Sequence, residues 1–258
     1  MPALRDDIDP DGLLEYSVVF SDRSLNSMSA AFGEVMRDIS RIMRNAYGAA
    51  SVAVVPGGGT YGMEAIARQF VRDANVMVIR NGWFSYRWSQ IIDAGGLAGK
   101  TTVLAARQLA DETDAPFAPL PLDDILAQIR AERPDIVFCP HVETSAGLMV
   151  PDDFIAAVTA CVHEIGGMFV LDCVASGTVF VNLEDTGVDV LLTAPQKGWS
   201  ASPCAALVMM SPRARTRLDE TTSSSFANDL KKWTQIMETY ESGAHAYHAT
   251  MPTAALRP

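Results

Sequence analysis

Residues Ile165–Trp199, IGGMFVLDCVASGTVFVNLEDTGVDVLLTAPQKGW, decide the fold that the sequence predicts. This stretch contains two strongly apolar runs, Met168–Leu171 and Val188–Thr193, which we interpret as buried parallel strands. Asp172 follows the first run directly, and Lys197 follows the second after a short turn. Because ligands of open α/β sheets bind outside the carboxyl ends of the strands, we expect the carboxylate and the amine to reach one site.

An amine and a carboxylate at one sheet edge favour a pyridoxal phosphate site. A deprotonated lysine amine is a nucleophile towards an aldehyde, and an aspartate that faces a pyridine nitrogen keeps that nitrogen protonated. Lysine is scarce in this chain, where it occurs otherwise only at Lys100, Lys231 and Lys232. Charged residues at strand ends are commonly solvated loop residues, so the interpretation depends on the rest of the sequence.

A glycine-rich segment follows the first predicted strand. Ser51–Val55 is apolar and β-branched, and it leads into PGGGT at 56–60 and an amphipathic segment at 61–70. Strand, glycines and helix in this order can bind a phosphate, because glycine lets the backbone approach and the first helical turn has free amides. The pattern is neither GxGxxG nor the P-loop, which disfavours a dinucleotide or ATP.

Apolar runs and amphipathic segments alternate along the rest of the chain. The alternation predicts right-handed crossovers and an α/β fold, with a mostly parallel sheet sandwiched by helices. For the first helix we expect Asn26 or Ser27 as the cap and Gly48 as the stop. Further strands are predicted at 76–79, 101–104, 135–139 and 205–210, and helices near 28–47, 123–130, 151–165 and 230–240.

The composition indicates a soluble globular protein. The chain has 258 residues, of which 48% are hydrophobic and 20% are charged, so it can form a substantial core. Its net charge of −11 argues against partners such as nucleic acid or anionic membranes. The four cysteines form no CxxC pair, so we expect reduced core thiols and no metal site. The start lacks signal-peptide features and no apolar run reaches transmembrane length, which favours the cytoplasm.

Six motifs, taken in order, resemble the class V aminotransferases of the fold type I pyridoxal phosphate enzymes. The resemblance is closest to the alanine–glyoxylate and serine–glyoxylate group, and it extends from about Ser51 to Thr250. Each motif is weak by itself, but six in the order of the family are specific. The motifs are PGGGTYGMEA (56–65), RNGWFSYRW (80–88), HVETSAGLMVP (141–151), FVLDCVAS (169–176), TAPQKGW (193–199) and YHATMPT (247–253).

The resemblance implies a role for each matching residue. Lys197 is similar to the lysine that binds the cofactor aldehyde and then moves a substrate proton, and Asp172 to the partner of the pyridine nitrogen. Phe84 is at the position where the family stacks an aromatic ring on the cofactor, and the neighbouring Trp83 is the alternative. Tyr247 and Thr250 are similar to residues that reach the phosphate of a neighbouring subunit, which implies a homodimer. The other implied cofactor-binding residues are Gly58, Gly59 and Thr60 at the phosphate, Thr144 near the ring, Phe84 and Val174 on its two faces, and Gln196 near the cofactor oxygens.

The resemblance implies transamination between a small amino acid, alanine or serine, and a small 2-oxo acid, glyoxylate or pyruvate. Two alternatives stay open: a lyase or desulfurase of the same fold, and an inactive truncated domain with a non-catalytic role. A desulfurase needs a nucleophilic cysteine in an exposed glycine-rich loop, and none of the four cysteines has such surroundings. The stretch SVVFSDRSLN at 17–26 departs from the glycine-rich opening of the family. The residues that form the amino-acid pocket are therefore not assigned.

The resemblance also implies a domain organisation. The family continues for roughly another hundred residues into a small domain with the arginine that binds the substrate carboxylate. We expect residues 1–27 to be an N-terminal arm, 28–243 the cofactor-binding large domain, and 244–258 the start of the connection to a small domain that is mostly missing. If the complete product ends at Pro258, we expect weak or no transamination, which a comparison with a product extended through the reading frame tests.

Overall fold

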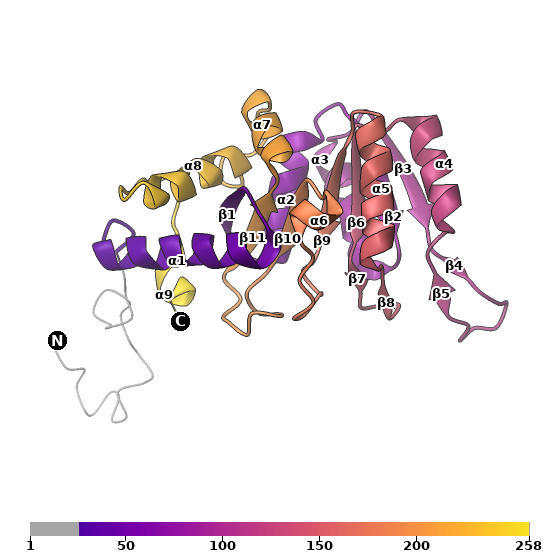
Figure 1. Ribbon diagram of the computed structural model, residues 1–258, viewed down its shortest axis with the longest axis horizontal. Helices are drawn as coiled ribbons and strands as arrows, with labels where there is room; N and C mark the ends of the chain where they lie inside the picture. Colours follow the sequence, from indigo (N-terminus) through magenta and orange to yellow (C-terminus); the bar gives the residue numbers. More distant parts are fainter. Residues whose placement is uncertain (1–25, 258) are drawn as a thin grey trace.

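The computed structural model of the chain describes residues 26–257, so most of the expected N-terminal arm lies outside the described residues. Its centre is a seven-stranded sheet with the order β1-β11-β10-β9-β6-β2-β3, which is flanked by helices (Figure 1). The predicted α/β fold class is confirmed. The strands of this sheet are β1 (Ser51–Pro56), β2 (Asn75–Arg80), β3 (Lys100–Ala105), β6 (Ile136–Pro140), β9 (Met168–Asp172), β10 (Val190–Thr193) and β11 (Ala205–Met210).

The helices and two small hairpins complete the described part of the chain. Figure 1 shows α1, α8 and α9 at one end of the molecule, with α4 and the β4–β5 hairpin at the other. The hairpins pair β4 (Arg107–Gln108) with β5 (Phe117–Ala118), and β7 (Val142–Glu143) with β8 (Leu148–Met149). The helices are α1 (Ala30–Tyr47), α2 (Gly59–Phe70), α3 (Trp83–Gly95), α4 (Leu122–Glu132), α5 (Asp152–Glu164), α6 (Leu183–Thr186), α7 (Pro212–Glu220), α8 (Leu230–Glu241) and α9 (Thr253–Leu256).

The directions of the strands explain why distant segments meet at one sheet edge. Strands β10, β9, β6, β2 and β3 are parallel to one another, whereas β11 is antiparallel to both β1 and β10. The short connection at 194–204 contains no crossover helix, which is why β11 can return beside β10 only in the antiparallel direction. Because β11 is reversed on both sides, β1 and β10 run in the same direction and end at the same edge.

The first helix begins later than the sequence predicted. Ser29, rather than Asn26 or Ser27, is the N-cap, and its Oγ accepts from the Phe32 amide at 3.1 Å. Asn26 is occupied in a local turn, since its Oδ1 accepts from the Met28 amide at 2.8 Å. The predicted stop at Gly48 is confirmed, because this residue has the left-handed conformation with φ of 61°.

The hydrophobic core fixes α3 on the sheet beside the candidate site. Trp88 of α3 is fully buried and stacks on Phe138 of β6 with ring centroids 4.3 Å apart. Such a stacked pair contributes roughly 0.5–1.5 kcal/mol beyond the area that it buries. The first turn of α3, which contains Trp83 and Phe84, is therefore held in a constant position relative to the end of β6.

None of the helices within residues 26–257 combines the length and the apolar character that a membrane span requires.

Candidate active site

A cavity of about 170 Å³ opens where the carboxyl ends of β6 and β9 meet the segments that follow β1, β2 and β10. Asp172 and Lys197, which the sequence placed at the ends of different strands, both line it. The cavity therefore contains a carboxylate and an amine from separate strands. Its lining residues are Gly59, Thr60, Met63, Phe84, Arg87, Pro140, Val142, Thr144, Asp172, Val174, Ala175, Gln196 and Lys197.

Eight of the eleven residues that the sequence assigned to cofactor binding line this cavity. Gly58 is not among them, but it is the N-cap of α2 and directly precedes Gly59. Tyr247 and Thr250 do not line the cavity, and Tyr247 is 70% exposed. The roles of all eleven residues stay predictions, because the structure gives their positions and not their chemistry.

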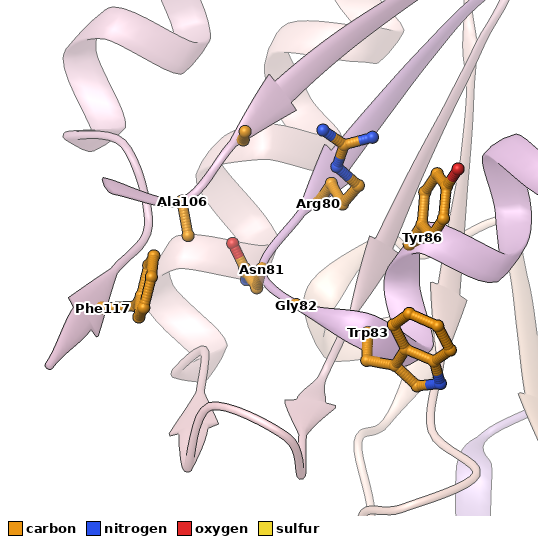
Figure 2. A pocket seen from close by; sticks show the side chains of 8 residues that line it. Arg80, Asn81, Gly82, Trp83, Tyr86, Ala106 and Phe117 are labelled. Atoms are coloured by element: carbon orange, nitrogen blue, oxygen red, sulfur yellow. The ribbon is translucent and has the colours of Figure 1, made fainter. Parts of the chain in front are cut away.

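Trp83 and Phe84 are now distinguished by position. Phe84 lines the cavity of Asp172 and Lys197, whereas Trp83 lines a neighbouring hollow of about 430 Å³ and is 63% exposed. Figure 2 shows Trp83 at the opposite side of this hollow from Phe117, with Arg80 and Asn81 between them. The residues that line the hollow include neither a lysine nor a carboxylate, so it lacks the pair of groups that defines the candidate site.

Asp172 is a buried carboxyl group of the cavity, and its pKa is raised. It ends β9 with only 8% of its surface exposed, and its Oδ1 accepts from the Val174 amide at 3.0 Å. Burial raises the pKa of its carboxyl to about 6, although the Val174 amide and the Arg87 charge act in the opposite direction. The negative charge of Glu143 raises it further. A hydrogen-bonded cation beside Asp172 would relieve the unfavourable desolvation of its ionised form.

A close backbone contact holds the turn of Lys197 against the segment that follows Asp172. A Cβ at Gly198 would lie 1.8 Å from the Gly177 carbonyl oxygen, so only glycine permits this approach. The Lys197 side chain is exposed at the cavity. The neighbouring Gln196 has a buried side-chain oxygen with no hydrogen-bond partner among the described residues. This turn therefore presents an amine and an unsatisfied acceptor beside the same cavity.

The N-terminus of α2 has the features of an anion site. Gly58 is the N-cap and provides no side-chain hydrogen bond, so the amides of the first turn have no side-chain acceptor. A Cβ at Gly59 would lie 2.9 Å from Val174 Cγ2, which explains why glycine is required there. Thr60 follows in the first turn and accepts a hydrogen bond from Arg87 at 3.0 Å. A compact anion such as a phosphate suits this arrangement.

Sequence reasoning assigned no site role to five residues that line the cavity, and Arg87 is the charged one among them. The five are Met63, Arg87, Pro140, Val142 and Ala175. Arg87 lies three residues after Phe84 on α3, and its guanidinium carbon is 5.5 Å from the centre of the Phe84 ring. The spacing of three residues on a helix places both side chains on one face, and this was a usable signal. The partner Thr60 belongs to another helix, and no local pattern identified that contact.

Glu143 is a buried carboxylate that organises the start of α3. It is 1% exposed and accepts from the amides of Phe84 at 3.1 Å and Ser85 at 2.9 Å. The hydroxyls of Ser85 and Ser145 donate to it at 2.7 Å and 2.6 Å. Burial alone would raise the pKa of Glu143, but these hydrogen bonds outweigh it and hold the pKa below its usual value.

We expect Glu143→Gln to destabilise the protein by about 1–3 kcal/mol, because the amide would place N–H groups opposite donors that now meet carboxylate oxygens. The free energy of unfolding in urea measures the effect. Glu164→Gln is the matched control, since Glu164 is exposed on α5 and forms a surface ion pair with Arg130. Equal stability of the Glu143 variant and the unmodified chain would contradict the role of this carboxylate.

The cysteines lie outside the lining of this cavity. All four cysteines are free and buried, and burial raises the pKa of each thiol. Between residues 26 and 257, no cluster of three or more His, Cys, Asp or Glu side chains is suited to a metal ion. The cavity instead combines a carboxylate, an amine, an aromatic ring and an anion site, and these groups fit pyridoxal phosphate.

Comparison with known proteins identifies relatives of this chain, although no protein-family model matches it. It is 26% identical over 233 residues to alanine–glyoxylate aminotransferase 1 of Saccharomyces cerevisiae, which covers 86% of this chain and 57% of the yeast protein. It is 32% identical over 213 residues to 2-aminoethylphosphonate–pyruvate transaminase of Burkholderia mallei, with coverages of 81% and 54%. The chain spans about half the length of these curated relatives.

A solved structure of an alanine–glyoxylate aminotransferase has a similar fold. Alanine–glyoxylate aminotransferase from Nostoc sp. matches with a TM-score of 0.75 and 25% identity, covering 90% of this chain and 59% of that chain. The fold is thus that of the large domain of the fold type I pyridoxal phosphate transferases. Within this class the relatives are alanine–glyoxylate and related aminotransferases, so the chain is a relative of the class V aminotransferases, and the resemblance indicated by the six motifs is confirmed.

Proposed function

We propose that this chain provides the cofactor-binding part of a pyridoxal phosphate-dependent aminotransferase. The observation that supports this most strongly is that Lys197 and Asp172, from separate strands, line one cavity. An aldehyde-binding amine and a carboxylate for the ring nitrogen must reach the same molecule of cofactor. The yeast and Burkholderia mallei relatives support the proposal, because both are named for amino transfer.

The residues of the chain have separate tasks in the proposed reaction. When bound, pyridoxal phosphate supplies an aldehyde that accepts the amino group and a ring that accepts electrons. The Nζ atom of Lys197 would hold the cofactor by that aldehyde, and as a free amine it would accept the proton of the substrate α-carbon and pass it to the cofactor carbon. The carboxylate of Asp172 holds a proton on the ring nitrogen. Phe84 and Val174, which line the cavity, would contact the two faces of the ring.

For the substrates, we propose a small amino acid, alanine or serine, and a small 2-oxo acid, glyoxylate or pyruvate. The name of the yeast relative contains alanine and glyoxylate, and that of the Burkholderia relative contains pyruvate. Among the described residues that line the cavity, Arg87 is the one arginine. We therefore propose that the group that binds the substrate carboxylate belongs to a segment or subunit beyond this cavity.

We also propose that the protein is a homodimer of the cytoplasm. Tyr247 is largely exposed and lies outside the cavity of its own chain, in keeping with a contact to the phosphate of a neighbouring subunit. Thr250 follows in the same exposed segment. In this proposal residues 28–243 are the large domain and residues 244–258 begin the connection to a small domain. The net charge of −11 and the free thiols support the compartment.

An absorbance titration tests the proposed function. We expect the purified chain to acquire a visible absorbance band with pyridoxal phosphate, and alanine or serine to convert that band to the spectrum of the aminated cofactor with formation of a 2-oxo acid. Release of sulfide, or of free ammonia with the cofactor left in its aldehyde form, would favour a lyase or desulfurase. Absence of any spectral change with the cofactor would exclude a pyridoxal phosphate site in this chain.

A further inference from the structure

Arg87 is a cation of the cavity for which the sequence assigned no role. It lines the same cavity as Asp172 and Lys197, and its Nη1 donates to Thr60 Oγ1 at 3.0 Å. Its guanidinium also lies over the Phe84 ring, 5.5 Å from the ring centre. Among the described residues, no carboxylate forms an ion pair with it. This half-buried guanidinium is therefore held by a hydroxyl and a ring, and its charge acts on Asp172 without a direct ion pair.

The groups around Arg87 point to an anion as the missing partner. Thr60 is in the first turn of α2, whose N-cap Gly58 provides no side-chain acceptor. The positive end of the helix dipole and the guanidinium thus act on the same region of the cavity. A planar guanidinium has five donors in a fixed geometry, and one hydrogen bond to Thr60 leaves several of them free for an oxyanion.

We propose that Arg87 binds the phosphate group of the cofactor, together with Thr60 and the first-turn amides of α2. This inference rests on the proposed function, because it assigns one residue to one end of the same ligand. A phosphate monoester, which bears about 1.5–2 negative charges at pH 7, matches one guanidinium and a helix N-terminus better than a single carboxylate does. The hydrogen bond to Thr60 places Arg87 at the glycine-rich turn, on the proposed phosphate side of the site.

Three probes and three variants test this assignment. The probes are pyridoxal phosphate, pyridoxal without the phosphate, and inorganic phosphate, each titrated into the purified chain. We expect Arg87→Ala to weaken binding of pyridoxal phosphate by about 10- to 100-fold, because the charge-assisted hydrogen bonds of one guanidinium are lost. Binding of pyridoxal should stay within about twofold. Arg87→Lys keeps the charge but loses the planar geometry, so its loss should be intermediate.

Arg80→Ala is the matched control, because Arg80 is in the same RNGWFSYRW motif, lies over the Tyr86 ring and lines the neighbouring hollow instead (Figure 2). We expect this variant to bind all three probes like the unmodified chain. Thermal unfolding of each variant without ligand shows that the comparison is made on folded protein. Inorganic phosphate should raise the melting temperature of the unmodified chain and of Arg80→Ala, and this rise should disappear in Arg87→Ala.

The outcomes separate this inference from the proposed function. An equal loss of affinity for pyridoxal phosphate and pyridoxal would overturn it, because Arg87 would then act through the Phe84 ring alone. A loss of amino-acid affinity with unchanged cofactor affinity would assign Arg87 to the substrate carboxylate and also overturn it. If the unmodified chain binds phosphate through Arg87 but shows no spectral change with pyridoxal phosphate, the anion site stands and the proposed function fails.

Discussion

Replacing Lys197 by alanine is expected to abolish the visible absorbance that the chain acquires with pyridoxal phosphate. The amine of Lys197 lines the cavity and is the proposed nucleophile for the cofactor aldehyde, so no other group of the cavity can replace it. Loss of proton transfer by this amine alone should lower any amino transfer by about 10²- to 10⁴-fold. Absorbance spectra and a single-turnover assay with alanine measure the two effects.

Lys232→Ala is the matched control for this variant. Lys232 is exposed on α8 and contacts Gln235 of the same helix, so its loss should leave the spectrum and the reaction unchanged. Because Lys197 is also exposed, both variants should unfold within about 0.5 kcal/mol of the unmodified chain. A visible band that persists in Lys197→Ala would show that another amine binds the aldehyde.

The variant Asp172→Asn is expected to stabilise the protein without cofactor while it impairs the cofactor chemistry. Burial raises the pKa of Asp172 to about 6, from 3.8 for an ordinary aspartate, so the native state binds the proton more tightly than the unfolded chain. The ionised carboxylate therefore destabilises the fold as pH rises from about 4 to 6, by up to roughly 3 kcal/mol above that range. Asparagine keeps the shape and the acceptor for the Val174 amide but lacks this charge.

The sign of the pH dependence makes this prediction specific. Above about pH 6, Asp172→Asn should be more stable than the unmodified chain in urea, and the difference should vanish as pH falls towards 4. In the presence of pyridoxal phosphate the same variant should react with alanine about 10²- to 10³-fold more slowly, since a neutral amide does not hold a proton on the ring nitrogen. A variant that is less stable at pH 8 than at pH 4, relative to the unmodified chain, would contradict the burial of an ionised carboxylate.

Much of the fold was predictable because its signals are local. The apolar runs at β9 and β10 and the glycines before α2 specify strand, turn and helix within a few residues. The reversed direction of β11 was not predictable, since it depends on pairing with β1, which lies about 150 residues earlier in the chain. The predicted N-cap of α1 was wrong because Asn26, Ser27 and Ser29 are all suitable cap residues. Asn26 forms a local turn instead, and Ser29 caps the helix.

The candidate site shows the same division between local and distant signals. Asp172 and Lys197 follow apolar strands, so their positions at the sheet edge were evident from the pattern. The contacts of Arg87 with Thr60 and of Glu143 with Ser85 join residues 27 and 58 positions apart. Such contacts result from the packing of α3 against α2 and the end of β6, which no periodicity in the sequence describes. The roles of Tyr247 and Thr250 concern a second copy of the chain and stay predictions.

Borohydride reduction of the chain with pyridoxal phosphate, followed by peptide mass mapping, tests the central claim most directly. The chain contains only four lysines, Lys100, Lys197, Lys231 and Lys232, so the modified residue can be assigned without ambiguity. We predict one reduced cofactor adduct per chain, on Lys197. An adduct confined to the other three lysines, or no adduct, would contradict the assignment of this cavity to pyridoxal phosphate.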